Sequence, residues 1–110
     1  MTPDQVGQPI TIRYSHYWPP LGPPNCAVFI DGRCISKTAS GEPWERWVGR
    51  GVACPPEWPF GTQLLAFGQT WTCVDRGSKV TDNWVDFLVP EPHLAYGSLV
   101  EVKVIWSEGE

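Results

Sequence analysis

The chain has few basic residues and no long apolar stretch. Its 110 residues include 8 lysines and arginines against 12 aspartates and glutamates, so the formal net charge is −4 at pH 7. Binding to a nucleic-acid backbone needs a basic surface, because much of the affinity comes from counterion release, and we therefore expect no nucleic-acid partner. No apolar run approaches the roughly 20 residues of a membrane-spanning helix, so no membrane span is expected either.

The sequence also lacks the C-x-x-C spacing that is typical of structural zinc sites. Its two histidines, His16 and His93, have no partner pattern for a metal or a catalytic triad, so no metal and no cofactor are expected. The four cysteines allow three disulfide pairings. Disulfides indicate a secreted, envelope-associated or thermophilic setting, and a secreted or cell-envelope location is the prediction.

The residues that are abundant favour an all-β protein. Seven tryptophans and twelve prolines stand among only 110 residues, and proline breaks helices while favouring extended structure and turns. This length suits one domain with a modest core. We expect a single barrel domain over residues 10–106, a flexible segment over residues 1–9 and a short tail over 107–110, in a monomeric protein.

Runs of β-branched and aromatic residues, separated by turn signals, predict about six strands. The expected strands cover residues 11–18, 51–54, 63–67, 70–74, 84–89 and 99–106. A tight turn is expected at Gly68-Gln69, and one helical turn at Trp44–Trp47. Short strands with turns between them are typical of a small barrel.

Two disulfides fit this arrangement. Cys26 and Cys34 flank a segment with Asp31-Gly32 at its centre, which is a strong hairpin-turn signal. Facing positions of a hairpin come within disulfide reach, so a Cys26–Cys34 bridge is expected. A Cys54–Cys73 bridge would then join two neighbouring strands.

Asp86 is the residue whose surroundings most need an explanation. Side chains alternate between the two faces of a strand, so Trp84, Asp86 and Leu88 share one face. A carboxyl group between bulky apolar neighbours is desolvated, and desolvation raises its pKa toward the range that suits a general acid. By the same alternation Asp75 shares a face with Trp71 and Cys73. In the alternative interpretation, Asp75 only caps a turn and Asp86 only accepts backbone hydrogen bonds.

The order of five short motifs strengthens the functional interpretation. They are Val52-Ala53-Cys54-Pro55-Pro56, Pro59-Phe60-Gly61-Thr62, Asp75-Arg76-Gly77-Ser78, Val85-Asp86-Phe87 and Gly97. In this order the sequence resembles the 3D (three-aspartate) domain of the double-psi β-barrel superfamily, found in membrane-bound lytic transglycosylase A and in resuscitation and sporulation wall enzymes. The cysteine-bearing N-terminal part is more distantly similar to barwin and expansins. Pro55 stands where the family has its first aspartate, and Ser78 where it has a second glycine.

The resemblance implies a six-stranded double-psi β-barrel that acts on a wall polysaccharide, with Asp86 as general acid/base and Asp75 as its electrostatic partner. Lytic transglycosylation needs no second enzymic nucleophile, because the 6-hydroxyl of the sugar attacks within the same molecule. Two alternatives remain open. One is a non-catalytic, expansin-like module that binds or loosens the wall, and the other is a structural assembly domain of an envelope or phage protein.

Several aromatic residues are candidates for contact with a sugar. Trp44, Trp47 and Trp58 lie in expected loops, where core packing explains a large ring less easily. Trp71, Trp84 and Trp106 lie in expected strands and are mostly assigned to the core. Trp84 is still kept among the candidate substrate-binding residues, together with Tyr14.

Overall fold

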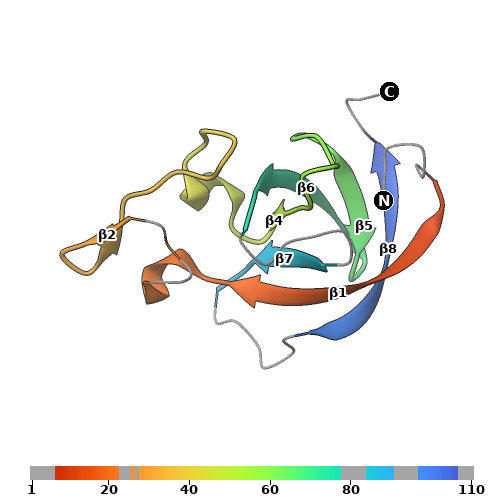
Figure 1. Ribbon diagram of the computed structural model, residues 1–110, viewed down its shortest axis with the longest axis horizontal. Coiled ribbons are helices and arrows are strands. Elements are labelled where there is room, and N and C mark those ends of the chain that lie inside the picture. Colours follow the sequence, from red (N-terminus) through yellow and green to blue (C-terminus); the bar gives the residue numbers. More distant parts are fainter. Residues whose placement is uncertain (1–6, 23–25, 27, 78–83, 91–96, 107–110) are drawn as a thin grey trace.

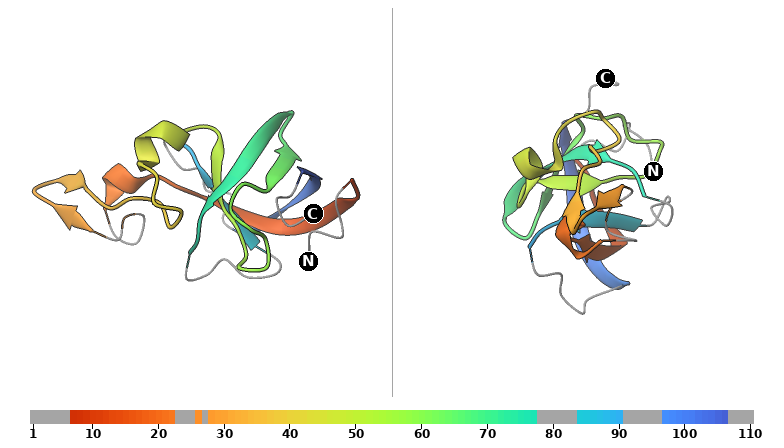
Figure 2. Two further views of the ribbon diagram at one scale, coloured as in Figure 1. Left: turned by 90° about the horizontal axis from the view of Figure 1, so that it is seen from above. Right: turned by 90° about the vertical axis from the view of Figure 1, so that its left-hand side faces the viewer.

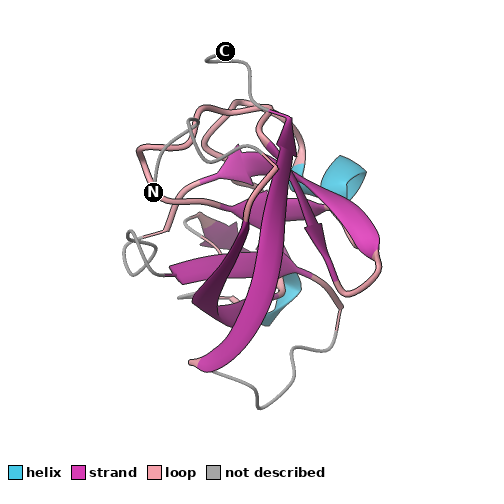
Figure 3. Ribbon diagram, turned by 90° about the vertical axis from the view of Figure 1, so that its right-hand side faces the viewer, coloured by secondary structure: helices cyan, strands magenta, loops and turns pink. Residues whose placement is uncertain are grey.

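A computed structural model describes residues 7–22, 26, 28–77, 84–90 and 97–106. Six strands close into a barrel in the order β1-β7-β4-β6-β5-β8 (Figure 1). They are β1 (Pro9–Tyr17), β4 (Gly51–Ala53), β5 (Gln63–Ala66), β6 (Gln69–Asp75), β7 (Trp84–Leu88) and β8 (Ser98–Trp106). The pairs β1–β7 and β4–β6 are parallel and the other four pairs are antiparallel. The predicted all-β, six-stranded barrel is confirmed, and Figure 3 shows its strands wrapping around the interior.

A small arm extends away from the barrel (Figures 1 and 2). It is the hairpin of β2 (Phe29–Ile30) and β3 (Arg33–Cys34). Asp31 and Gly32 both have positive φ, 52° and 74°, as a two-residue hairpin turn of this twist requires. The predicted Cys26–Cys34 disulfide closes the arm, with its Cα atoms 5.9 Å apart.

One short 3-10 helix follows β1, and a second follows the arm. The first, η2, covers Pro19–Leu21, and the second, η3, covers Trp44–Trp47. The second is the helical turn that the sequence predicts. Among the described residues, no helix has the length and hydropathy needed to cross a membrane.

Alternate residues of the strands fill the barrel interior. Ile12, Val52, Val85, Phe87 and Val102 are almost fully buried and belong to one cluster. The Cys54–Cys73 disulfide lies within this cluster, confirming the predicted pairing, and both cysteines are 0% exposed. Its closure of a 19-residue separation contributes about 3 kcal/mol of stability in the chain-entropy model.

The turn between β5 and β6 lies one residue earlier than expected. Ala66 pairs with Gln69, so the two turn residues are Phe67 and Gly68, with φ of 53° and 75°. Glycine tolerates this backbone region and phenylalanine does not favour it. The Phe67 ring offsets that cost by edge contacts with Tyr14 and Phe87 at 5.2 and 5.3 Å between centroids.

At the ends of the chain, β1 begins at Pro9, one residue before the expected domain boundary at residue 10. Residues 1–6 of the expected N-terminal segment and the expected tail at 107–110 lie outside the described residues, as do Ser78 and His93.

Candidate functional site

A β-bulge brings the two candidate aspartates to the same outer face of the barrel. Val52 pairs with Cys73, but the next residue of β4, Ala53, pairs with Asp75, so Val74 is the extra residue in β6. On its other side Ala53 pairs with Asp86 of β7. The two aspartates therefore flank Ala53, and their Cα atoms are separated by two strand spacings, roughly 10 Å.

The bulge corrects one prediction from the sequence. Strict alternation placed Asp75 on the face of Trp71 and Cys73, which the structure shows to be the barrel interior. The extra residue at Val74 reverses the alternation, as bulges do, and turns Asp75 outward. The predicted set Trp84, Asp86 and Leu88 does share a face, because Val85 and Phe87 point into the core.

Asp86 lies in a partly enclosed position and has one described hydrogen-bond donor. The hydroxyl of Ser15, its register partner on β1, donates to Oδ1 across 3.0 Å. The indole Nε1 of Trp84 donates in turn to the Ser15 hydroxyl across 2.9 Å. Burial, opposed by the Ser15 hydrogen bond and reinforced by the charge of Asp75, raises the pKa of Asp86 to about 6. A carboxyl group with this pKa is protonated in an appreciable fraction of molecules near neutral pH.

Asp75 is surrounded by donors. Its Oδ1 accepts from the backbone N–H of Ala39 at 2.8 Å and of Arg76 at 2.9 Å. Its Oδ2 accepts from the hydroxyl of Tyr17 at 2.9 Å. Burial and the charge of Asp75 raise the pKa of Tyr17, so the phenol stays neutral and donates. One candidate carboxyl thus accepts three hydrogen bonds and the other accepts one from a described residue.

The side chain of Arg76 lies beside Asp75, and its described hydrogen bonds go to backbone oxygens and not to the Asp75 carboxylate. Its guanidinium donates to the backbone oxygens of Asp75 at 3.1 Å and Trp58 at 2.7 Å, and it lies 4.1 Å over the ring of Phe60. Desolvation lowers the pKa of Arg76, although the charges of Asp75 and Glu57 oppose the shift. The group supplies a fixed positive charge at one edge of the site.

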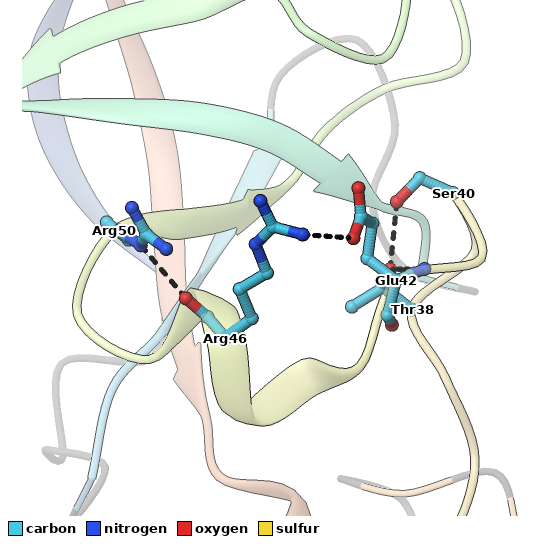
Figure 4. A network of polar contacts seen from close by, with 5 residues as sticks. All are labelled: Thr38, Ser40, Glu42, Arg46 and Arg50. Atoms are coloured by element: carbon cyan, nitrogen blue, oxygen red, sulfur yellow. Dashed lines mark hydrogen bonds and ion pairs between the residues drawn. The ribbon is translucent and has the colours of Figure 1, made fainter.

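A polar network holds the loop that reaches Asp75 (Figure 4). The hydroxyl of Thr38 contacts that of Ser40 at 2.9 Å and bonds to the backbone of Glu42. The Glu42 carboxylate pairs with Arg46 at 3.3 Å, and Arg50 donates to the backbone oxygen of Arg46 at 2.9 Å. Since Ala39 lies inside this loop, the network fixes the N–H group that binds Asp75.

The candidate aromatic residues divide between the two faces. Trp44 and Trp47 pack against an outer cluster of Tyr17, Ala53 and Leu88, next to the aspartates. Trp84 lies on the same face, as its bond to Ser15 shows.

Trp58 and Tyr14 are not brought to the aspartates. Trp58 is 1% exposed within the barrel core, so its ring has no face open to a sugar, and this burial does not fit the predicted role in substrate binding. Tyr14 points inward and lines a cavity of about 290 Å³ with His16, Phe67, Trp71 and Val89. Pro55 is fully buried.

Ser15 and Tyr17 are site residues that the sequence analysis did not identify. Both lie on the outer face of β1, only 6% and 9% exposed, and each bonds to one of the two aspartates. Their spacing of two residues in a predicted strand was the available signal, because it places both on one face. Nothing in the sequence indicated that this face meets β7 and the end of β6.

No group of three or more histidine, cysteine, aspartate or glutamate residues in the described part of the chain is placed to hold a metal ion. Comparison of the chain with family models, with curated proteins and with solved structures finds no match.

Proposed function

We propose that this chain is a glycan-active barrel domain of the cell wall, in which Asp86 acts as general acid/base and Asp75 assists it. The observation that carries the proposal is the pair of carboxyl groups on one face, in different surroundings. Asp86 has a pKa raised to about 6, whereas Asp75 accepts three hydrogen bonds. Carboxyl groups with different surroundings are the usual basis for separate acid and electrostatic roles.

The proposed reaction is cleavage of peptidoglycan strands by lytic transglycosylation. Protonated Asp86 gives its proton to the glycosidic oxygen, and the bond from C1 to that oxygen breaks. The 6-hydroxyl of the same sugar then attacks C1 to form an anhydro ring, and its proton returns to Asp86. The negative charge of Asp75 stabilises the positive charge that develops at C1. Trp44 and Trp47, which pack against the outer cluster next to the aspartates, are the proposed contacts to the glycan.

The two disulfides support a secreted or cell-envelope location, where thiols are oxidised. The wall polysaccharide is the proposed partner, and the resemblance of the motifs to the 3D domain supports the same assignment.

One observation favours a second function, a non-catalytic expansin-like module. Pro55 stands where the 3D domain has its first aspartate and is buried, so only two of the three carboxylates of that domain are present.

Digestion of purified peptidoglycan separates these functions. The wild-type chain should release products with anhydro-muramyl ends, detected by mass spectrometry. Asp86→Asn should abolish them, and Asp75→Asn should reduce them about 10²–10³-fold, the usual effect of losing one electrostatic contact in a transition state. Asp31→Asn, in the exposed turn of the arm, is the matched control and should retain activity. Retention of the glycan without any product would indicate the binding module.

A further inference from the structure

The chemistry of the groups around Ser15 determines which group donates in each of its two hydrogen bonds. Its hydroxyl lies 2.9 Å from the indole Nε1 of Trp84 and 3.0 Å from Oδ1 of Asp86. Ser15 and Asp86 are register partners in the parallel β1–β7 pair, and Trp84 lies two residues before Asp86 on the same face. Because Ser15 is only 6% exposed, its hydroxyl has little access to water.

An indole N–H group donates a hydrogen bond and has no lone pair with which to accept one. Ser15 therefore accepts from Trp84. Its own hydrogen is directed to Oδ1 of Asp86, which is the acceptor described for this nearly buried hydroxyl. Oδ1 then acts as an acceptor whether Asp86 is charged or neutral. When Asp86 takes up a proton, Oδ2 is the favoured site, because a protonated Oδ1 would be a poorer acceptor for the Ser15 hydroxyl.

We propose that Trp84 and Ser15 are positioning residues that hold the acid proton of Asp86 on Oδ2. We call the hydrogen-bonded series Trp84–Ser15–Asp86 the relay. In it the indole orients the Ser15 hydroxyl, and the hydroxyl determines which oxygen of Asp86 carries the proton. Its catalytic consequence rests on the proposed function, because only a general acid benefits from having its proton on one defined oxygen. The position of the proton itself does not depend on any activity.

The relay also predicts how the pKa of Asp86 responds to substitution. A hydroxyl that can only donate stabilises the ionised carboxylate, and the Ser15 hydrogen bond lowers the pKa against the larger effect of burial. Without the indole N–H, Ser15 is free to rotate and accept from the protonated carboxyl, which stabilises the acid form. Asp75 is the titratable group whose charge acts on Asp86, and Tyr17, whose own pKa is raised partly by Asp86, stays neutral; these substitutions leave both in place.

Neutron diffraction from perdeuterated wild-type crystals at about pD 5 gives the direct test, because it locates deuterium atoms. The expected map has a deuteron on Oδ2 of Asp86 and the Ser15 deuterium directed at Oδ1. A deuteron on Oδ1, or a Ser15 hydroxyl directed away from Asp86, overturns the proposal. This measurement needs no variant, so it decides the matter even where a substitution prevents folding.

Carboxyl ¹³C NMR titration provides the second test. Trp84→Phe should raise the pKa of Asp86 by about 0.5–1, because it removes the contact that orients the Ser15 hydroxyl. Ser15→Ala should raise the pKa at least as much, because it removes the donor itself. Trp44→Phe is the control, since its indole N–H donates to the backbone oxygen of Cys34 and not to Ser15. An unchanged pKa in Trp84→Phe contradicts the relay. Failure to cleave peptidoglycan, with the deuteron found on Oδ2, would instead reject the proposed function and leave the relay intact.

Discussion

The hydroxyl of Tyr17 donates to Oδ2 of Asp75 across 2.9 Å, joining the last residue of β1 to the last residue of β6. The two strands are not neighbours in the barrel, since β7 and β4 lie between them. The contact therefore spans the outer face on which Asp86 also lies. It holds the Asp75 carboxyl in place, whereas the partly buried Asp86 accepts one hydrogen bond from a described residue.

Tyr17→Phe should lower the free energy of unfolding by about 1–2 kcal/mol, because it removes one hydrogen bond to a carboxylate that keeps two other donors. Urea unfolding at pH 7 measures the change. Tyr14→Phe is the matched control, since the Tyr14 hydroxyl makes no hydrogen bond to a described residue, and the expected change is below about 0.5 kcal/mol. Equal losses in the two variants would show that the Tyr17 hydroxyl has no special role.

Asp86 should make the fold less stable as the pH rises through about 6. Its pKa is raised in the folded state from 3.8 to about 6, so the folded protein binds the proton more tightly than the unfolded chain. The resulting stabilisation is fully present below about pH 4 and is lost as the pH rises through 6, a loss of roughly 2–3 kcal/mol.

Asp86→Asn should remove this contribution and stabilise the protein at pH 8 by a comparable amount. The amide oxygen can still accept from Ser15, and no charge is buried. The difference between wild-type and variant unfolding free energies, measured from pH 4 to 8, isolates the effect of this residue. Glu101→Gln removes one exposed carboxylate from β8 and controls for the change in net charge. A difference that does not vary with pH would show that Asp86 is not perturbed.

Glycan cleavage should also decline as the pH rises above about 6, because the general acid must carry its proton. We expect kcat to fall about tenfold for each pH unit above 7, since the protonated fraction falls by that factor. Initial rates of anhydro-product release from pH 4 to 8 provide the measurement. A rate that rises with pH over this range would indicate that Asp86 acts as a base in the slow step.

The regular parts of this fold follow from local chemistry. The six barrel strands are visible as β-branched and aromatic runs between turns, and the Asp31-Gly32 turn fixes the hairpin of the arm. Local alternation also identified Asp86 as an unusual carboxyl. The strict alternation of faces fails at Val74. This residue and its neighbour Cys73 are both buried, at 4% and 0% exposed. A bulge depends on how β6 pairs with β4, which is a contact between distant segments.

The loop that covers the site could not be predicted from the sequence either. Ala39 reaches Asp75 because the loop before η3 folds over the end of β6, where Ser40 also donates its backbone N–H to Val74 at 3.1 Å. Such tertiary contacts leave no periodic pattern. The same is true of Trp58, whose position in a loop suggested an exposed ring although the structure buries it.

Gly51 provides a last test of how closely η3 packs beside the site. A Cβ atom at this position would lie 2.7 Å from Cβ of Trp47 and 3.0 Å from Val74, so an added methyl group must displace the tryptophan from the outer cluster. Gly51→Ala should cost about 1–3 kcal/mol of stability, the range for overpacking, and should change the near-ultraviolet circular dichroism. Gly49→Ala is the control, because a Cβ atom there meets no atom within 4 Å. At its φ of 76° an alanine should cost roughly 1 kcal/mol of stability from backbone strain alone. A Gly51→Ala variant as stable as the wild type would show that η3 can move away from β4, and that Trp47 is not held beside Ala53.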